Sequence, residues 1–217
     1  MSERTRFINV NIIITIIKKM TTILKPALEK IMSIFYKDKN ECFHLRELSR
    51  RTGLYGQSIT RSLNLLEKEK YVHSQRKGNL RNYSTTHNKK VYAIFTLLDI
   101  NKFEKLPPQR KQAIETYFKN LRKQPVYALL FGSTAKENYS EASDMDIFLI
   151  TNQKIETKNA EKEVDALHAI KISTFQMTQK EFLKELKQKD DKVLQSAIHT
   201  GYPLLNHIKW YEETKVS

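Results

Sequence analysis

The 217-residue sequence predicts a two-domain protein of the α+β or α/β class, and three observations support this prediction. Helical patterns after residue 26 end in a short basic hairpin. After residue 126, short apolar runs typical of buried strands alternate with helical patterns. Between the two stretches, Pro107 and Pro108 interrupt helix formation and mark a boundary. We expect an apolar segment of unassigned role at 1–25 and domains at 26–105 and 106–217.

The net charge of +14 and the pI of about 9.7 are spread unevenly along the chain. Residues 44–90 contain 11 Lys or Arg and 3 Glu, whereas residues 107–217 contain 17 Lys or Arg and 15 acidic residues. A basic block of this kind predicts a polyanionic partner, with double-stranded DNA as the first candidate. The alternative is a solvated basic surface that has no such partner.

Cys42 is the single cysteine, so an internal disulfide is excluded and a reducing, cytoplasmic location is expected. No apolar run reaches the roughly 18 residues of a membrane-spanning helix, so no membrane partner is expected. The apolar stretch at residues 7–17 leaves three interpretations open. It is a surface covered by a second subunit, a signal peptide without a small-residue cleavage site, or sequence ahead of a true start at Met20.

Three helices are predicted at the start of the first domain. Pro26 suits the first turn of a helix, a second helix from about residue 43 is closed by Gly53, and a third covers about 56–69. In the third helix an apolar face consists of Ile59, Leu63 and Leu66. The opposite face has no acidic residue and consists of Gln57, Thr60, Arg61, Asn64 and Lys68.

A hairpin follows these helices. Extended runs at residues 71–76 and 80–85 flank Lys77-Gly78-Asn79, a turn signal. The basic residues near the tip are Arg76, Lys77 and Arg81. A helix at 90–103 then leads to the proline boundary.

The order of these elements, with the segments RTGLYGQSITRSLNLLEKEKYV and RKGNLRNYS, resembles the winged helix-turn-helix regulators of archaea and bacteria over residues 27–90. Lys70 departs from the resemblance, because the family usually has glycine there. The resemblance implies that the third helix enters the major groove, that the hairpin contacts the DNA backbone or minor groove, and that the protein is a homodimer. The implied DNA contacts are Gln57, Thr60, Arg61 and Asn64 on the helix and Arg76, Lys77 and Arg81 on the hairpin. The alternative is a protein-interaction module.

The second domain begins with a strand at 126–131 that stops at Gly132-Ser133, and a second strand at 147–150 follows Asp144-Met145-Asp146. Residues i and i+2 of a strand point to one side, so Asp144 and Asp146 can converge on one point. Mg²⁺ takes one or two protein carboxylates together with substrate phosphates. Gly132 allows close approach of a backbone to an anion, and Ser133 can donate to a phosphate. Further along, we expect helices at 109–122, 158–169, 178–188 and 191–200, a strand at 170–177, a helix cap at Gly201 and a last helix ending at Trp210.

Gly132-Ser133, a ten-residue spacer and Asp144-Met145-Asp146 resemble the signature of the nucleotidyltransferase superfamily, the DNA polymerase β-like group. The resemblance implies a small mixed sheet with flanking helices. It also implies a Mg²⁺ site at Asp144 and Asp146, which would be the catalytic carboxylates. Gly132 and Ser133 would bind ATP or another nucleoside triphosphate.

Active members of this superfamily place a third carboxylate on the next strand, where Ser173 stands here. A serine cannot replace a carboxylate as a general base or as a charged metal ligand. Three explanations stay open: Asp165 or Glu163 of the preceding helix substitutes, the acceptor is activated in another way, or the domain does not catalyse. Whether the protein is an enzyme is therefore not decided by the sequence.

These patterns lead to three functional hypotheses. The first is a DNA-binding transcriptional regulator whose nucleotidyltransferase-like domain binds Mg²⁺ and a nucleoside triphosphate and transfers a nucleoside monophosphate to an acceptor hydroxyl. The second is an antitoxin-type minimal nucleotidyltransferase that adenylylates a protein acceptor. The third is an inactive nucleotidyltransferase relic that acts as a scaffold.

Overall fold

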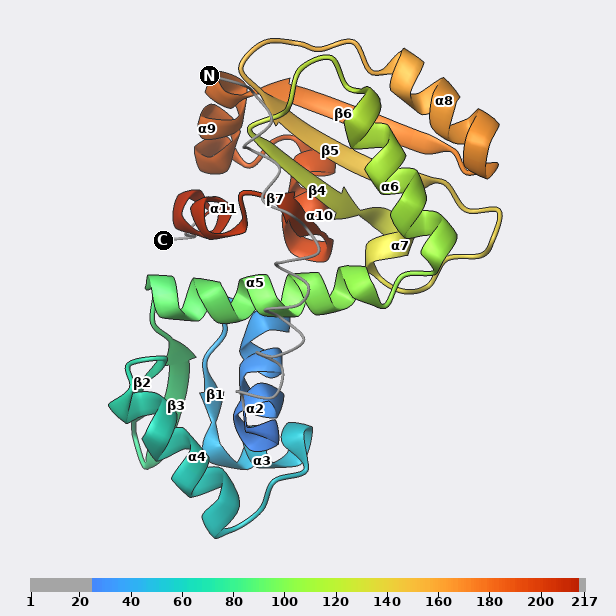
Figure 1. The fold of residues 1–217 in the computed structure, drawn as a ribbon. Coiled ribbons are helices and arrows are strands. Elements are labelled where there is room, and N and C mark those ends of the chain that lie inside the picture. Colours follow the sequence, from blue (N-terminus) through green and yellow to red (C-terminus); the bar gives the residue numbers. More distant parts are fainter. Residues whose placement is uncertain (1–24, 215–217) are drawn as a thin grey trace, which may run out of the picture. The chain divides into compact units, whose positions relative to one another are not determined.

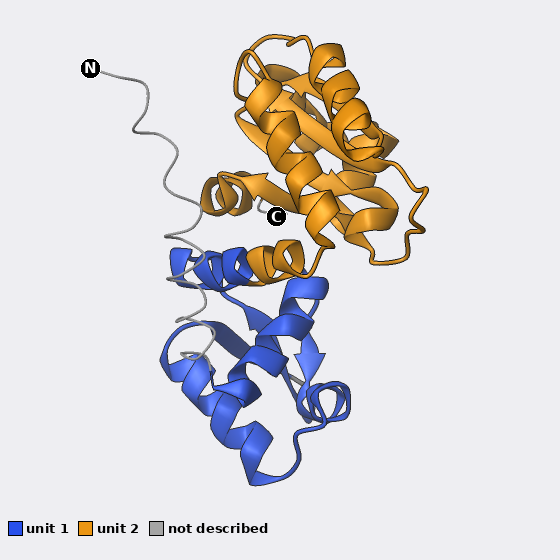
Figure 2. Cartoon of the chain, turned by 45° about the vertical axis from the view of Figure 1, so that its right-hand side comes forward, with its two compact units in different colours: residues 1–97, 216 blue, residues 98–215, 217 orange. Residues whose placement is uncertain are grey.

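A computed structural model of the chain describes residues 25–214, except for the side chain of Lys77. The apolar stretch at residues 7–17 lies outside the described residues. Residues 25–97 and 98–214 form two compact units, each with its own core (Figure 2). None of the helices within 25–214 is both long enough and apolar enough to cross a membrane.

Unit 1 combines helices with a three-stranded antiparallel sheet (Figure 1). The sheet has the order β1-β3-β2, in which β2 and β3 form the predicted hairpin. The elements are α2 (Pro26–Lys37), β1 (Phe43–His44), α3 (Leu45–Thr52), α4 (Gln57–Lys68), β2 (Val72–Lys77), β3 (Leu80–Thr85) and the first turns of α5 (Lys89–Glu104).

The helices of unit 1 form close to where the sequence predicts them, but residues 43–44, expected as the start of the second helix, form the short strand β1 instead. Gly53 closes α3 in the left-handed conformation, with φ of 69° and its N–H bonded to the Ser49 carbonyl. The apolar face of α4 is buried at Ile59, Leu63 and Leu66, so the predicted orientation of this helix is confirmed. The predicted polar face of α4 is consequently the exposed one.

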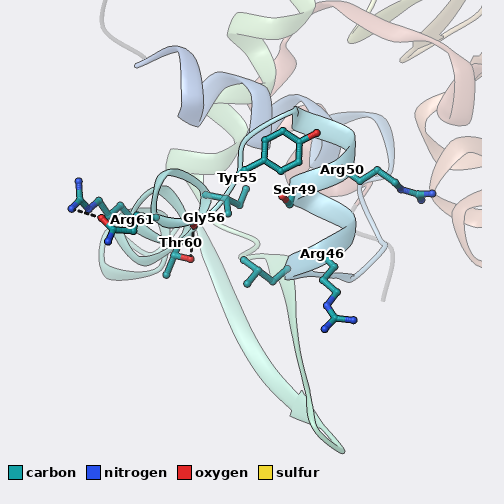
Figure 3. Close-up of a pocket in the computed structure, with 10 residues that line it drawn as sticks. Arg46, Ser49, Arg50, Tyr55, Gly56, Thr60 and Arg61 are labelled. Carbon is teal, nitrogen blue, oxygen red and sulfur yellow. Dashed lines mark hydrogen bonds between the residues drawn. The ribbon is translucent and has the colours of Figure 1, made fainter.

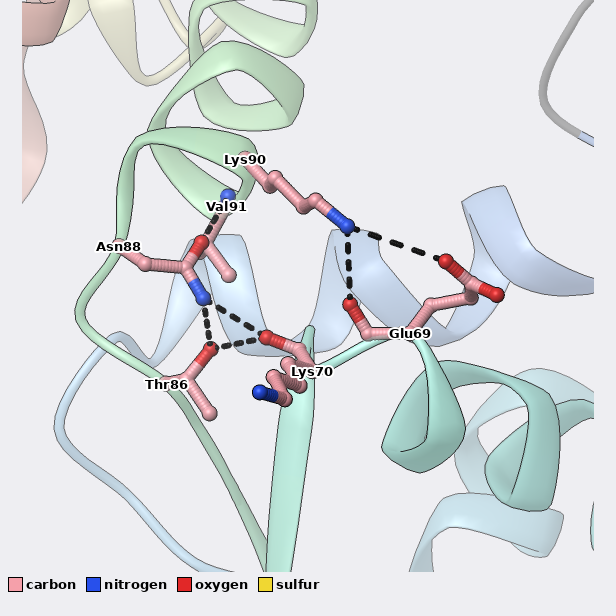
Figure 4. Close-up of polar contacts among 6 residues, drawn as sticks. All are labelled: Glu69, Lys70, Thr86, Asn88, Lys90 and Val91. Carbon is pink, nitrogen blue, oxygen red and sulfur yellow. Dashed lines mark hydrogen bonds and ion pairs between the residues drawn. The ribbon is translucent and has the colours of Figure 1, made fainter.

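At the junction after α4, Lys70 adopts a backbone conformation that glycine adopts most readily (Figure 4). Lys70 has a φ of 62°, which is strained for a residue with a Cβ. Its carbonyl accepts hydrogen bonds from Thr86 Oγ1 at 2.5 Å and Asn88 Nδ2 at 2.8 Å. Asn88 Oδ1 in turn accepts from the Val91 N–H at 3.0 Å and thereby caps α5. These bonds offset the backbone strain.

Unit 2 is built on a four-stranded mixed sheet of order β6-β5-β4-β7. The β5–β6 pair is parallel, and β4 pairs antiparallel with both β5 and β7. The strands are β4 (Tyr127–Phe131), β5 (Met145–Thr151), β6 (Ile172–Thr178) and β7 (Tyr202–Leu205). The helices are α6 (Pro108–Asn120), α7 (Gly132–Ala135), α8 (Lys158–His168), α9 (Gln179–Gln188), α10 (Lys192–Thr200) and α11 (His207–Glu213), together with the end of α5.

Helices cover both faces of this sheet. On one face α6 and α8 lie side by side (Figure 1), and Tyr117 and Val164 join Leu130 of β4 in the core. On the other face, Phe182 of α9 and Trp210 of α11 stack with their ring centroids 5.4 Å apart. Because alternate residues of β4 point to opposite faces, this strand is buried along its whole length.

Two features of unit 2 differ from the sequence-based expectation. Residues 202–205, expected only as a lead-in to the last helix, form the edge strand β7, whose Pro203 is tolerated there because an edge strand needs fewer backbone donors. Gly201 does follow α10, but its φ is −89° and not that of a left-handed cap. A Cβ on Gly201 would lie 2.5 Å from the Ala197 carbonyl oxygen and 2.7 Å from that of Leu130. Close packing against β4 therefore requires glycine at this position.

Candidate functional sites

The two aspartates of the Asp-Met-Asp motif lie at the start of β5. This strand begins at Met145, two residues earlier than predicted, so Asp146 lies within it and Asp144 immediately before it. In the sheet, Asp146 is opposite Phe131, the last residue of β4, and opposite Ser173 on the parallel strand β6. The sheet thus brings the Gly-Ser turn, the two aspartates and Ser173 together at one end of its strands.

Gly132 makes room for the Asp146 carboxylate. Its φ is 69°, and a Cβ built there would lie only 2.0 Å from Asp146 Oδ2. An L-residue at this position would therefore be strained in its backbone and would displace the carboxylate. Ser133 follows in the short helix α7 and is partly exposed.

The electrostatics of the site favour a cation. Burial and the neighbouring Asp144 carboxylate raise the pKa of Asp146 above its ordinary value. Within residues 25–214, no Lys or Arg side chain lies within ion-pair distance of either carboxylate. The described residues contain no group of three or more His, Cys, Asp or Glu side chains that could hold a metal. A pair of carboxylates still suits Mg²⁺, whose remaining ligands are commonly waters and substrate phosphates.

Ser173 occupies the place on β6 where the resemblance to the nucleotidyltransferases predicts a third carboxylate. Its hydroxyl donates to Asp144 Oδ2 over 3.4 Å, a long hydrogen bond. Glu163 and Asp165 lie on α8, as expected, and both are exposed. No third carboxylate faces Asp146 from β6.

The polar face of α4 is a second candidate site, in unit 1. All four of its predicted contact residues are exposed, namely Gln57, Thr60, Arg61 and Asn64. Arg61 donates to Gln57 Oε1 at 2.8 Å, and Thr60 bonds the Gly56 carbonyl at 3.1 Å (Figure 3). Gln57, Thr60 and Arg61 line an open groove of about 730 Å³ between α3 and α4.

Three side chains of this groove were not among the contact residues predicted from the sequence. Arg46 and Arg50 project from α3 (Figure 3), and Tyr55 is 70% exposed in the turn between the helices. Among the described residues, Arg46 and Arg50 have no acidic partner within ion-pair distance. The spacing of Arg46 and Arg50 could have indicated this pair, because residues four apart on a helix lie on one face.

The basic hairpin residues differ in how far they are available to a ligand. Arg76 is exposed, and the side chain of Lys77 lies outside what the structure describes. Arg81 forms an ion pair with Glu67 Oε2 of α4 at 2.6 Å and donates to Ser74 Oγ at 2.8 Å. Hydrogen bonding from Ser74, together with the charge of Arg81, lowers the pKa of Glu67. Arg81 thus links the hairpin to α4, and its charge is largely compensated.

Comparisons with known proteins identify one domain. Residues 112–207 match the family model described as polymerase beta, nucleotidyltransferase. The solved structure of TrmBL2, an archaeal chromatin protein described with a novel mode of DNA binding, aligns with 84% of this chain and 76% of its own. The identity is 16% and the TM-score is 0.29, so this likeness supports no conclusion about function. No curated protein sequence matches the chain significantly.

Proposed function

We propose that this chain, in which residues 112–207 form a nucleotidyltransferase-like domain, is a DNA-binding regulator that binds a nucleoside triphosphate with Mg²⁺. The observation that supports nucleotide binding most directly is the pairing of Gly132 with Asp146. The glycine leaves space for a half-buried carboxylate whose charge, next to Asp144, calls for a cation. Such an arrangement destabilises the fold when no cation is present, and it is typical of a functional site.

Each residue of the site has a proposed role. Asp144 and Asp146 would hold Mg²⁺, and the Ser133 hydroxyl would donate to a phosphate of ATP or another nucleoside triphosphate. Bound Mg²⁺ would supply charge stabilisation at the phosphates. The turn at Gly132 keeps the Asp146 carboxylate close to the backbone that follows β4.

Nucleotide binding is favoured over nucleotidyl transfer because of Ser173. This serine stands opposite Asp146 on β6, whereas Glu163 and Asp165 lie on the helix α8 and are exposed. Transfer of a nucleoside monophosphate to an acceptor hydroxyl would therefore need another base. Adenylylation of a protein acceptor remains the second candidate function, supported by the two aspartates and the family match.

DNA binding is proposed for unit 1, as a winged helix-turn-helix. The proposed helix contacts are Gln57, Thr60, Arg61 and Asn64, joined by Arg46 and Arg50 at the neighbouring groove. Arg76 and Lys77 of the hairpin would contact the backbone, whereas Arg81 would mainly hold the hairpin in place. Two copies of the chain would read paired half-sites as a homodimer.

Calorimetric titration of the full chain with Mg-ATP tests the nucleotide site. The wild type should bind, and the Asp144→Ala/Asp146→Ala variant should not. The matched control is Glu163→Ala/Asp165→Ala, which removes two exposed carboxylates of the same unit and should leave binding unchanged. Absence of binding by the folded wild type would contradict the proposal and favour the scaffold hypothesis. Transfer of label from α-labelled ATP to a protein partner would instead support the adenylylation hypothesis.

A further inference from the structure

A buried arginine connects α6 to the segment between the two motifs of the nucleotide site. Arg110 is only 4% exposed. Its guanidinium donates to Thr134 Oγ1 at 3.0 Å, to the Ser140 carbonyl at 3.0 Å and to the Ser143 carbonyl at 2.9 Å, with a longer contact of 3.4 Å to the Glu141 carbonyl. Every one of these acceptors belongs to residues 134–143, the spacer of the Gly-Ser/Asp-Met-Asp pattern.

The charge of Arg110 has no acidic counterpart. Within residues 25–214, no carboxylate lies within ion-pair distance of its guanidinium. The cation is instead surrounded by carbonyl oxygens and by the Tyr139 ring, whose centroid lies 4.2 Å from Cζ. Burying a charge in this way is costly unless its hydrogen bonds are fully made. A neutral apolar residue would suffice for packing alone, so the bonds themselves indicate the purpose of this side chain.

The bonds of Arg110 reach both ends of the spacer. Thr134 is the residue after Ser133, and Ser143 is the residue before Asp144. Between them, the spacer contains a turn in which the Ser143 N–H bonds the Ser140 carbonyl and the Ser140 N–H bonds Ser143 Oγ. One rigid, planar group therefore holds the two ends of a ten-residue segment at a set separation.

We propose that Arg110 is the positioning residue of the nucleotide site. By holding Thr134 and Ser143, it sets the distance between the Ser133 hydroxyl and the Asp144 carboxylate, which must contact the phosphates and the metal of the same ligand. The nucleotide part of this inference depends on the proposed function, whereas the holding of the spacer does not.

The planar fork of Arg110 and its charge can be separated by substitution. Arg110→Lys keeps the charge but offers its donors from a single nitrogen, without the planar fork whose two nitrogens bond Thr134 and the two carbonyls. Arg110→Met removes both the charge and the bonds while keeping much of the apolar stem. Arg122→Met is the matched control, because Arg122 is exposed just beyond the same helix.

Limited trypsin digestion of the full chain measures the spacer directly. Lys136 is the single Lys or Arg between Lys123 and Lys154, so cleavage after it reports local opening of the spacer. Both Arg110 variants should be cleaved there about tenfold faster than wild type, since bonds to a charged group are lost, and the control should not. Unchanged cleavage in both variants would overturn the inference, whatever the outcome of nucleotide binding.

Mg-ATP affinity of the same variants measures the consequence for the site. Arg110→Lys should bind about tenfold more weakly than wild type, because the fork and not the charge sets the separation. Retention of full affinity by Arg110→Lys, with loss in Arg110→Met, would show a purely electrostatic role and overturn the positioning proposal. If wild type itself does not bind Mg-ATP, the proposed function fails and the cleavage result alone decides on the spacer.

A milder variant covers the case in which Arg110→Met does not fold. Thr134→Val keeps the volume of this buried side chain and removes the acceptor for one guanidinium nitrogen. Faster cleavage after Lys136 with weaker Mg-ATP binding would support the proposal. Faster cleavage with wild-type affinity would contradict it, because the separation of Ser133 and Asp144 would then not matter.

Discussion

Replacement of Gly132 by alanine tests the contact on which the nucleotide site depends. The new Cβ would lie 2.0 Å from Asp146 Oδ2, far inside van der Waals contact, at a backbone φ of 69°. The left-handed conformation should cost roughly 1–2 kcal/mol. Displacement of the carboxylate should add about 1–3 kcal/mol, the range typical of overpacking. Gly132→Ala should therefore lower the free energy of unfolding of unit 2 by roughly 2–5 kcal/mol.

The two costs can be separated with a double-mutant cycle. In an Asp146→Ala background the carboxylate is absent, so Gly132→Ala should cost mainly the backbone strain, roughly 1–2 kcal/mol, although the Cβ of residue 146 still lies 3.3 Å from the new one. Gly53→Ala in unit 1 gives an independent measure of that strain, because Gly53 has the same φ of 69° and nothing within 4 Å of its Cβ position.

Urea unfolding followed by the fluorescence of Trp210 is the assay, because this single tryptophan is buried in unit 2. The cycle should give a coupling free energy of about 1–3 kcal/mol between Gly132 and Asp146. Calorimetry should show that Gly132→Ala also weakens Mg-ATP binding, with a loss of binding free energy at least as large as its loss of unfolding free energy. A coupling below about 0.5 kcal/mol, the usual error of additivity, would refute the contact between the glycine and the carboxylate.

Three further predictions concern charge. Asp144→Asn should stabilise ligand-free unit 2 at pH 7 by about 0.5–2 kcal/mol. Because the pKa of Asp146 is raised in the folded state, the free energy of unfolding falls as pH rises through that pKa. Urea unfolding followed by Trp210 fluorescence should show a smaller fall in the variant than in wild type. Arg61→Ala should weaken DNA binding and lower the salt dependence of the binding constant by about one, without affecting Mg-ATP binding. Arg81→Ala should mainly reduce thermal stability, because it breaks the ion pair with Glu67. Fluorescence anisotropy at several salt concentrations measures the first effect and circular dichroism the second; weaker DNA binding by Arg81→Ala alone would contradict the assignment. Burial lowers the pKa of His207 from 6.5 to about 4, so the free energy of unfolding should fall as pH drops from 6.5 towards 4. His207→Gln should make the urea midpoint of unfolding less dependent on pH in this range. An unchanged pH dependence in the variant would show that His207 is not its cause.

Elements with a strong local signal were predictable from sequence. The apolar period of α4, the glycine that ends α3 and the strand residues 127–131 all appear where local patterns place them. The mixed α+β class follows from the same patterns. The short strand β7 was not predictable, because four residues containing a proline form a strand only when a neighbour such as β4 supplies the hydrogen-bond partners.

The candidate site shows the same division. The spacing of Gly132-Ser133 and Asp144-Met145-Asp146 pointed to a nucleotidyltransferase-like domain, and residues 112–207 match that family. The spacing did not show that Gly132 makes room for Asp146, since the two residues are fourteen positions apart and meet only when β4 pairs with β5. Arg110 gave no local signal at all, because a basic residue in the first turn of a helix normally points to solvent.

The sequence by itself therefore determined the helices and strands with strong local patterns, the basic character of the first domain, and the residue types at the end of the second sheet where β4 ends and β5 begins. Local propensity and periodicity depend on neighbours within a few positions, so the chain states them directly. The tertiary structure decided which charges are available. Arg81 is compensated by Glu67, Arg46 and Arg50 have no acidic partner among the described residues, and Arg110 is buried against a loop. Long side chains reach groups that folding brings near, and only the packed chain determines which groups those are.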